Sequence, residues 1–483
     1  LKDCVVKLTA KAGAGGRLIF IGDAPKYENA RPSQRAKALY ERSIHISASK
    51  SALMDAIAPV RLIDIHSDSG ARANQYVHQI RRDGDALWLF IAQAKAPYNR
   101  DVPVGQNVRI RVEGVFRPTV YDTLTGTIHP IPHRAENGAT EIYARLWDED
   151  SLLLLLEPVE HSCLEETVAP AAQKALLTVD ALARYALDEP NALLLDQAEF
   201  AVDDGPWQAR EEILRAAEKC FAMLGWPVGD DLQPYAKAPN DPSHTVRFRF
   251  SIHSEARFAG VHLAGECLEG AKISLNGESA AASPDGWYVD KCLATYALPP
   301  LQAGENTLLV EMPFGQRTNL EWMYLLGDFA VVLRGRQARL APREECIGFG
   351  SIAEQGFPFY GGNISYEIPF ESQGGEVTLR AAHYRGATMK IALDGKDLGL
   401  LTYAPYEMSL GALPAGKHTL TIALFGHRGN GFGPVHLADE NERWIGPPAW
   451  HTTGNKWTYE YRLKPIGLLS APILLEARAE DRS

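Results

Sequence analysis

The side chains best suited to bind a ligand gather in one stretch, residues 313–370. Aromatic rings alternate there with polar groups that can form hydrogen bonds with hydroxyls. The polar members are Gln316, Arg317, Asn319, Glu321 and Asn363, and the rings are Phe314, Trp322, Tyr324, Tyr360 and Tyr366. Sites for neutral polar ligands such as sugars combine apolar surface with a few placed polar groups. The pattern predicts that Glu321, Trp322, Tyr324, Tyr360 and Asn363 bind substrate.

The alternative for these rings is structural. Aromatic side chains bury large apolar areas wherever they pack. Short runs with alternating apolar residues flank the stretch, at 246–252, 307–310 and 330–333, and this period of two is typical of strands. The rings would then fill the cores of two β-sandwiches and seal the junction between them.

A second polar and aromatic cluster lies near the C-terminal end. It comprises His383, residues 425–433, His436, Asp439, Glu440, Trp444, Trp450 and Trp457. A carbohydrate-binding face uses such rings, with Arg and Asn as partners for hydroxyls, so we add His427, Asn430 and Trp450 to the predicted substrate-binding residues. Here too the alternative is a sandwich core, with residues 426–433 as a long glycine-rich turn.

No metal or cofactor is expected. His436, Asp439 and Glu440 could hold a cation, but no further ligand stands at a recognisable spacing. The six cysteines lie far apart without a CxxC pair, so neither a zinc site nor a dense disulfide framework is indicated. The glycines at 13–16 stand between a helix and a strand, whereas a phosphate loop runs strand, glycines, helix. We interpret them as a helix C-cap.

No acid/base pair is predicted either. Asp188 and Glu189 are adjacent carboxylates, but neighbouring side chains of an extended segment point in opposite directions. Loop caps and solvated charges are the favoured roles for them.

Composition excludes several classes of function. The chain of 483 residues has a formal net charge of −11, whereas nucleic-acid binding needs clustered Lys and Arg. It contains no apolar run of about 18 residues, so no membrane span is expected. The sparse cysteines favour a reducing compartment, and we expect a cytoplasmic protein. The chain begins at Leu1 without an initiator Met or a signal segment, which suggests that it is part of a longer protein.

Residues 1–73 alternate helix and strand. Helices are expected over 3–12, from the cap Ser33 and from the cap Ser49 to residue 57, and strands at 17–22, 44–46 and 60–65. This order is typical of a doubly wound α/β domain, here only a partial one.

The rest of the chain is mainly β. Residues 74–158 have a period of two, with a tight hairpin turn at Asp83-Gly84, and predict a small antiparallel β-sandwich. Residues 159–245 are interpreted as a connecting region with one helix over 206–224, closed by Gly225. Residues 246–342 and 343–483 have the strand spacing of two jelly-roll β-sandwiches.

Three segments carry a resemblance to a known family: Arg-Arg-Asp-Gly-Asp-Ala-Leu-Trp-Leu-Phe-Ile-Ala at 81–92, Tyr-Asp-Thr-Leu-Thr-Gly-Thr-Ile at 121–128 and Trp-Thr-Tyr-Glu-Tyr-Arg-Leu-Lys-Pro-Ile-Gly-Leu at 457–468. With the order of domains, they resemble the C-terminal half of large bacterial glycoside hydrolases of the family 106 α-L-rhamnosidase type. The resemblance implies that the two jelly rolls are galactose-binding-like and that 457–468 is the closing strand of the last sandwich. It also implies that the catalytic acid and base lie on an N-terminal (β/α)₈ barrel.

Glycoside cleavage needs two carboxylates about 5–9 Å apart across the sugar, and no barrel strand ending in Glu or Asp occurs here. No catalytic residue is therefore carried over. We expect a non-catalytic half of a glycoside hydrolase that supports the barrel and lines its sugar pocket, with carbohydrate and the N-terminal catalytic segment as partners. A free-standing carbohydrate-binding protein and a purely structural or homo-oligomerising half are the alternatives.

Overall fold

The computed structural model describes residues 4–28, 30–160, 163–165, 174–226, 242–439 and 445–478. The chain forms two compact units. The first comprises Leu1–Pro97 with Val104–Ala169, and the second comprises Tyr98–Pro103 with Pro170–Ser483. The described residues contain no helix long and apolar enough to cross a membrane.

The first unit begins with short helices and a two-stranded parallel sheet. The elements are α1 (Cys4–Gly13), β1 (Ile19–Ile21), β2 (Tyr27–Glu28), β3 (Arg31–Pro32), α2 (Gln34–Glu41), β4 (Ile44–Ile46), α3 (Lys50–Ile57) and a 3-10 turn (Ala58–Val60), with β1 parallel to β4. The predicted caps are confirmed, because the Ser33 and Ser49 hydroxyls accept hydrogen bonds from the backbone N–H groups of Ala36 and Ala52, both at 3.2 Å.

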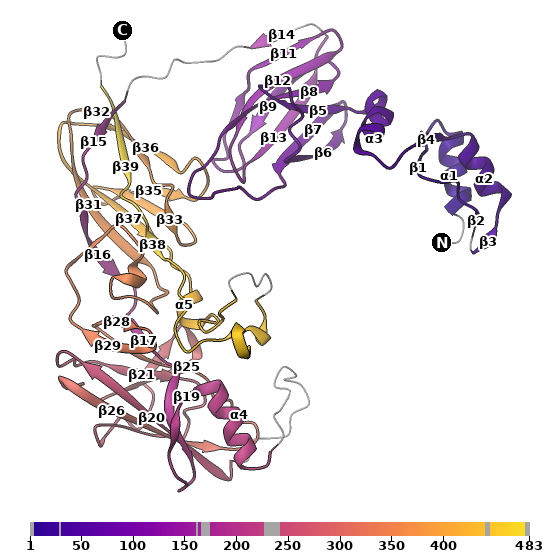
Figure 1. The fold of residues 1–483 in the computed structure, drawn as a ribbon. Coiled ribbons are helices and arrows are strands. Elements are labelled where there is room, and N and C mark those ends of the chain that lie inside the picture. Colours follow the sequence, from indigo (N-terminus) through magenta and orange to yellow (C-terminus); the bar gives the residue numbers. More distant parts are fainter. Residues whose placement is uncertain are drawn as a thin grey trace. The chain divides into compact units, whose positions relative to one another are not determined.

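An antiparallel β-sandwich follows in the same unit (Figure 1). One sheet has the order β10 (Ile128–Pro130), β9 (Phe116–Tyr121), β13 (Ser151–Pro158), β7 (Ala86–Gln93), β6 (Tyr76–Asp83). The other has the order β14 (Cys163–Glu165), β11 (His133–Glu136), β12 (Ala139–Leu146), β8 (Gln106–Glu113), β5 (Ile63–Ser67). The predicted hairpin between β6 and β7 is present, but its two turn residues are Gly84 and Asp85 and not Asp83 and Gly84, because Asp83 pairs with Ala86. Gly84 has a φ of 59° and Asp85 does not have a positive φ, so the turn is not the predicted type I′ turn.

The strand expected at 60–65 has a different partner from the one predicted. It is β5, and it pairs with β8 of the sandwich instead of joining the parallel sheet. Ile63 and Ile65 point into the sandwich core, so the alternation of this strand belongs to the period-two region.

The second unit contains two sandwiches, of which we call the first sandwich A. One of its sheets has the order β17 (Asn191–Leu195), β27 (Met323–Gly327), β21 (His262–Gly265), β25 (Asp290–Ala297), β24 (Gly286–Tyr288). The other has the order β19 (Gln208–Glu212), β18 (Gln197–Val202), β20 (His244–Ser254), β26 (Gly304–Phe314), β22 (Lys272–Leu275), β23 (Glu278–Ser279), with β28 (Ala330–Arg334) and β29 (Gln337–Ala341) attached to β20. Helix α4 (Ile213–Met223) lies beside β18 and β19 (Figure 1).

Sandwich B completes the second unit. One sheet has the order β15 (Lys174–Leu177), β39 (Ile473–Arg478), β32 (Gly375–Arg380), β36 (Glu407–Leu413). The other has the order β30 (Cys346–Gly348), β16 (Leu182–Leu187), β31 (Ile364–Ser372), β37 (Gly416–Leu424), β34 (Met389–Leu393), β35 (Lys396–Leu401). The remaining elements are β33 (Tyr384–Arg385), β38 (Gly467–Leu468), α5 (Gly429–Phe432) and 3-10 turns at Ile352–Glu354, Pro447–Ala449 and Gly454–Lys456.

The mainly β architecture is confirmed, but the stretch 159–245 is more than a connection. It supplies β16 to sandwich B and β17, β18 and β19 to sandwich A. Its helix begins at Ile213 and not at residue 206, because Gln208–Glu212 pairs with β18 and the Glu212 carboxylate then caps the helix. Gly225, with a φ of 67°, follows the C-cap as predicted.

The stretch 457–468 is not the closing strand of the last sandwich. That strand is β39, whereas Tyr459 and Tyr461 donate hydrogen bonds to Glu211 and Asp196 of sandwich A. We call residues 425–466 the C-terminal segment. Its aromatic and polar side chains bind carboxylates of sandwich A, which a strand paired into sandwich B could not do.

Cys220, Cys267, Cys292 and Cys346 are free thiols.

Candidate functional site

A groove on sandwich A arises where strand β20 loses its neighbour. Strand β18 pairs with β20 as far as Glu199 opposite Arg249, and β29 joins the same side of β20 only from His253 onward. The intervening residues 250–252 have no strand partner on this side among the described residues. The gap forms because the chain crosses at Asp196 from β17 in one sheet to β18 in the other, which leaves the backbone edge of β20 open.

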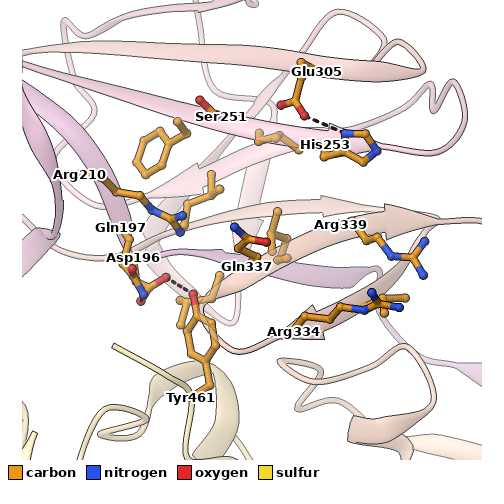
Figure 2. Close-up of a pocket in the computed structure, with 17 residues that line it drawn as sticks. Asp196, Gln197, Arg210, Ser251, His253, Glu305, Arg334, Gln337, Arg339 and Tyr461 are labelled. Atoms are coloured by element: carbon orange, nitrogen blue, oxygen red, sulfur yellow. Dashed lines mark hydrogen bonds and ion pairs between the residues drawn. The ribbon is translucent and has the colours of Figure 1, made fainter. Parts of the chain in front are cut away.

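The groove has a volume of about 400 Å³, within the usual range of small-ligand sites. It is lined by Leu193, Leu194, Leu195, Asp196, Gln197, Arg210, Phe250, Ser251, Ile252, His253, Glu305, Val332, Arg334, Gln337, Ala338, Arg339 and Tyr461. Figure 2 shows Ser251 and His253 on one side of the groove and Arg334, Gln337 and Arg339 on the other side.

The β28–β29 hairpin presents polar side chains on one face by its register. Val332 is opposite Arg339, and Arg334 is opposite Gln337. Since residues two apart along a strand share a face, Arg334 and Arg339 lie on the same side as diagonal neighbours. Arg339 pairs with Glu255. Arg334 and Gln337 have no side-chain partner among the described residues, so their donors are free for a ligand.

The opposite end of the groove is built around Asp196. The Tyr461 hydroxyl donates to Asp196 Oδ1 at 2.7 Å, and His436 Nε2 lies 2.6 Å from Asp196 Oδ2. Burial, and then the Asp196 charge, raise the pKa of Tyr461 well above its usual value, so the hydroxyl stays a donor. His436 Nδ1 and Gln197 Oε1 are buried without a hydrogen-bond partner, which is uncommon for buried polar atoms.

The side walls carry two further charged groups. Arg210 Nη2 donates to the backbone carbonyl of Arg336 at 3.3 Å and forms no ion pair in the described part of the chain. His253 Nδ1 lies 2.8 Å from Glu305 Oε1. The groove therefore combines unused guanidinium and amide donors, an open backbone edge and two carboxylates that already have partners.

Comparison with known proteins bears on the fold. No family model and no curated protein matches the sequence. Among solved structures, the rhamnosidase from Novosphingobium sp. PP1Y aligns over 99% of this chain and 32% of its own, with a TM-score of 0.41 and 12% identity. The β-D-mannosidase from Dictyoglomus thermophilum aligns over 49% of this chain and 31% of its own, with a TM-score of 0.19 and 14% identity. A putative β-galactosidase from Bacteroides fragilis aligns over 49% of this chain and 36% of its own, with a TM-score of 0.15 and 11% identity.

The chain is similar in structure to parts of glycoside hydrolases. It spans about a third of the length of the rhamnosidase that it matches.

None of the eight residues predicted to bind substrate lines the groove. Trp322 and Tyr324 are buried in the core of sandwich A; the indole of Trp322 donates to Glu212 Oε1 at 2.5 Å, and the hydroxyl of Tyr324 donates to the Gly431 carbonyl at 3.0 Å. Glu321 accepts a hydrogen bond from Asn319 at 3.0 Å, and burial raises its pKa. Trp450 packs against the same core.

Tyr360 and Asn363 lie where the two sandwiches meet, at a cluster that we call the sandwich junction (Asp188, Glu189, Tyr360, Asn363 and Arg428). Tyr360 is fully buried and donates to the Asn363 carbonyl at 2.6 Å, while Asn363 Nδ2 donates to Asp188 Oδ2 at 2.9 Å. Glu189 pairs with Arg428 at 2.7 Å. The two adjacent carboxylates thus have different partners, and Asp188 is exposed whereas Glu189 is half-buried.

The remaining predicted residues hold the C-terminal segment together. The Asn430 side chain exchanges two hydrogen bonds with the backbone of Lys464, both at 2.8 Å. His427 Nε2 lies 3.2 Å from the Pro465 carbonyl. For all eight residues, substrate binding stays a prediction. The polar groups of seven of them form hydrogen bonds within the chain, and the ring of the eighth, Trp450, packs on the core of sandwich A.

The residues considered for a catalytic pair, Asp188 and Glu189, lie at the sandwich junction. Of the residues considered for a metal, His436 lies beside the groove. His436 pairs with Asp196, and Glu440 lies outside the described residues. No group of three or more His, Cys, Asp or Glu able to hold a metal occurs in the described part of the chain. Sequence reasoning missed Arg210, Arg334 and Gln337. The alternation of Arg334, Gln337 and Arg339 about a Gly-Arg turn was a usable signal, since it predicts one polar face on a hairpin.

Proposed function

We propose that this chain is the non-catalytic C-terminal half of a glycoside hydrolase of the α-L-rhamnosidase-like type, and that its groove on sandwich A binds carbohydrate. The resemblance of residues 81–92 and 121–128 to that family supports the first part, and these residues form strands and turns of the N-terminal sandwich. The groove itself is the observation on which the second part depends.

The chemistry of the groove suits a sugar. Gln337 and Arg334 offer donors without partners, Ser251 offers a hydroxyl on the open edge of β20, and Tyr461 supplies ring surface. A ring of hydroxyls needs several such groups converging from different sides. The volume of about 400 Å³ accommodates a small saccharide.

The carboxylates of the groove do not suit hydrolysis. Asp196 is bonded to Tyr461 and His436, and Glu305 is bonded to His253. A glycosidase needs one carboxylic acid free to protonate the leaving oxygen and a second carboxylate across the bond. We therefore place bond cleavage in the N-terminal catalytic segment that the family resemblance implies.

Calorimetric titration of the chain with L-rhamnose and a panel of neutral oligosaccharides tests binding. We expect saturable binding that weakens about two- to tenfold in Gln337→Ala, the loss of one net hydrogen bond. Gln316→Ala is the matched control, because Gln316 is exposed and belongs to the aromatic stretch instead of the groove. If Gln316→Ala lost affinity and Gln337→Ala did not, the sugar would bind at the aromatic stretch and not in the groove.

Hydrolysis is tested separately with an aryl α-L-rhamnoside. The chain alone should release no phenol, whereas the chain joined to its N-terminal catalytic segment should. Release by the chain alone would contradict the proposal.

A purely structural role is the second candidate, and the hydrogen bonds and packing of the eight predicted residues within the chain favour it. It predicts a stable complex with the N-terminal segment and no affinity for any sugar. Co-purification of the two segments together with flat calorimetric titrations would select this candidate over the first.

A further inference from the structure

We infer that the groove accepts an acidic sugar, with its anionic group held at Arg334. This inference rests on the proposed carbohydrate-binding role and specifies the class of ligand. It covers one chemistry, a singly charged group on a sugar, which a uronic acid carboxylate or a sulfate ester can supply.

The charges that line the groove do not cancel. Arg210, Arg334 and Arg339 face two carboxylates, Asp196 and Glu305. Glu305 is bonded to His253, and Arg339 is paired with Glu255 outside the groove lining. Asp196 is bonded to Tyr461 and His436. What remains is the guanidinium of Arg334, without a carboxylate partner, and that of Arg210, bonded only to a backbone carbonyl.

Arg334 is placed so that its positive charge can bind an anionic group of a ligand in the groove. It shares one face of the hairpin with Arg339, which is its diagonal neighbour in the register, and Figure 2 shows both guanidinium groups at the same end of the groove. A planar guanidinium fork matches the two oxygens of a carboxylate or sulfate. The chain as a whole has a net charge of −11. Arg339 is paired with Glu255, whereas Arg334 has no carboxylate partner among the described residues, so the two neighbouring arginines keep a net positive charge and form a local site for an anion.

The other end of the groove explains why the anion should be part of a sugar. Asp196, Gln197 and Tyr461 lie there, and the buried Gln197 Oε1 has no donor. A hydroxyl can donate to that oxygen, whereas an ionised carboxylate such as acetate has no donor. A sugar with one charged group therefore uses both ends, with hydroxyls at Gln197 and the anion at Arg334.

The test is a calorimetric titration of the full chain with D-galacturonate, D-galactose, D-galactose 6-sulfate and acetate, carried out at low and at high salt. We expect at least one acidic sugar to bind about tenfold or more tightly than D-galactose, the gain of one charge-assisted hydrogen bond, and this gain should shrink as salt rises. Preference for the uronate or for the sulfate ester identifies the source of the charge.

Arg334→Gln should abolish the difference between acidic and neutral sugars. Its matched control is Arg184→Gln, which removes an exposed arginine on β16 of sandwich B. Because Arg334 is exposed at the end of β28, the variant should fold normally, and circular dichroism checks this. Substitution at Arg184 should leave the difference intact.

Each alternative outcome separates this inference from the proposed function. Equal affinity for acidic and neutral sugars overturns the inference and leaves carbohydrate binding in place. Acetate that binds as tightly as D-galacturonate keeps the anion site but overturns the carbohydrate role. A preference for acidic sugars that survives in Arg334→Gln overturns the assignment to Arg334, and the absence of any binding overturns both.

Discussion

The groove on sandwich A and the sandwich junction contain the same kinds of side chain, yet they differ in how these side chains are used. At the junction, Tyr360, Asn363 and Asp188 bond to one another, and among its described buried side-chain atoms Nη1 of Arg428 alone is left without a partner. In the groove, Arg334 and Gln337 have no side-chain partner among the described residues. Composition alone does not separate a binding site from a polar core, because the difference lies in whether the donors and acceptors are already satisfied.

Glycine shows the same contrast. A Cβ atom at Gly362 would lie 2.1 Å from Glu189 Oε1 and 2.6 Å from the Tyr360 hydroxyl. The glycine pair after Tyr360 therefore allows close packing of the junction, and it leaves no space for a ligand.

The largest effect is expected for Tyr360→Ala. The fully buried ring fills the core of sandwich B, and its removal should lower the free energy of unfolding by about 3–5 kcal/mol. Urea unfolding measures this, with Tyr403→Ala as the exposed control, expected to change it by less than about 0.5 kcal/mol. If Tyr360→Ala kept its stability and lost its affinity for sugar, the sugar-binding site would lie at the junction and not in the groove.

Asn430→Ala should have the next largest effect. The amide satisfies the backbone N–H and C=O of Lys464, both at 2.8 Å, and unpaired buried groups cost about 1–3 kcal/mol. Asn455→Ala, at an exposed position of the C-terminal segment, is the control for unfolding in urea. Equal stability of the two variants would show that the Asn430 amide is free for a ligand after all.

Much of the fold followed from periodicity, whereas the groove did not. The caps Ser33 and Ser49 depend on a few neighbouring residues, so local rules predicted them, and the same rules predicted the hairpin after β6 to within one residue. The groove depends on the point at which β18 ends beside β20 and β29 begins. Glu199 and Arg249 are 50 positions apart along the chain, and His253 and Arg339 are 86 positions apart, so no local pattern specifies these pairings.

The same reason explains the misassigned segment at 457–468. Its alternating aromatic residues, Trp457, Tyr459 and Tyr461, have the period of a strand. Their hydroxyl and ring contacts with Glu211, Arg215 and Asp196 of sandwich A determine its course instead. Tertiary contacts therefore override the local preference, as is common for strands.

The dependence of the free energy of unfolding on pH tests the buried carboxyl group of Glu212. Burial raises the pKa of Glu212, against the hydrogen bond from Trp322 that lowers it. Above the ordinary carboxyl pKa of about 4.3, the folded state then holds the proton more tightly than the unfolded chain. The free energy of unfolding of the wild type should fall, relative to Glu212→Gln, as the pH rises from that value to the raised pKa.

The slope of this fall is at most about 1.4 kcal/mol per pH unit. Urea unfolding of both proteins between pH 4 and 8 measures it, where the variant serves as the reference for all other titrating groups. A wild-type advantage that grows with pH would mean that the ionised carboxylate, capping α4, is the stabilising form.

The smallest effect on stability is expected for Ser251→Val. Ser251 is exposed on the unpaired stretch of β20 and lines the groove, so its replacement by a β-branched residue should change the free energy of unfolding by less than about 0.5 kcal/mol. Affinity for a neutral sugar should nevertheless fall about two- to tenfold, since one hydroxyl partner is lost. Ser279→Val, on the exposed strand β23 of the same sheet, should change neither quantity. If Ser251→Val lost stability but kept its affinity for sugar, Ser251 would have a structural role like that of the junction residues. Its hydroxyl would then bond within the chain and would not bind a ligand.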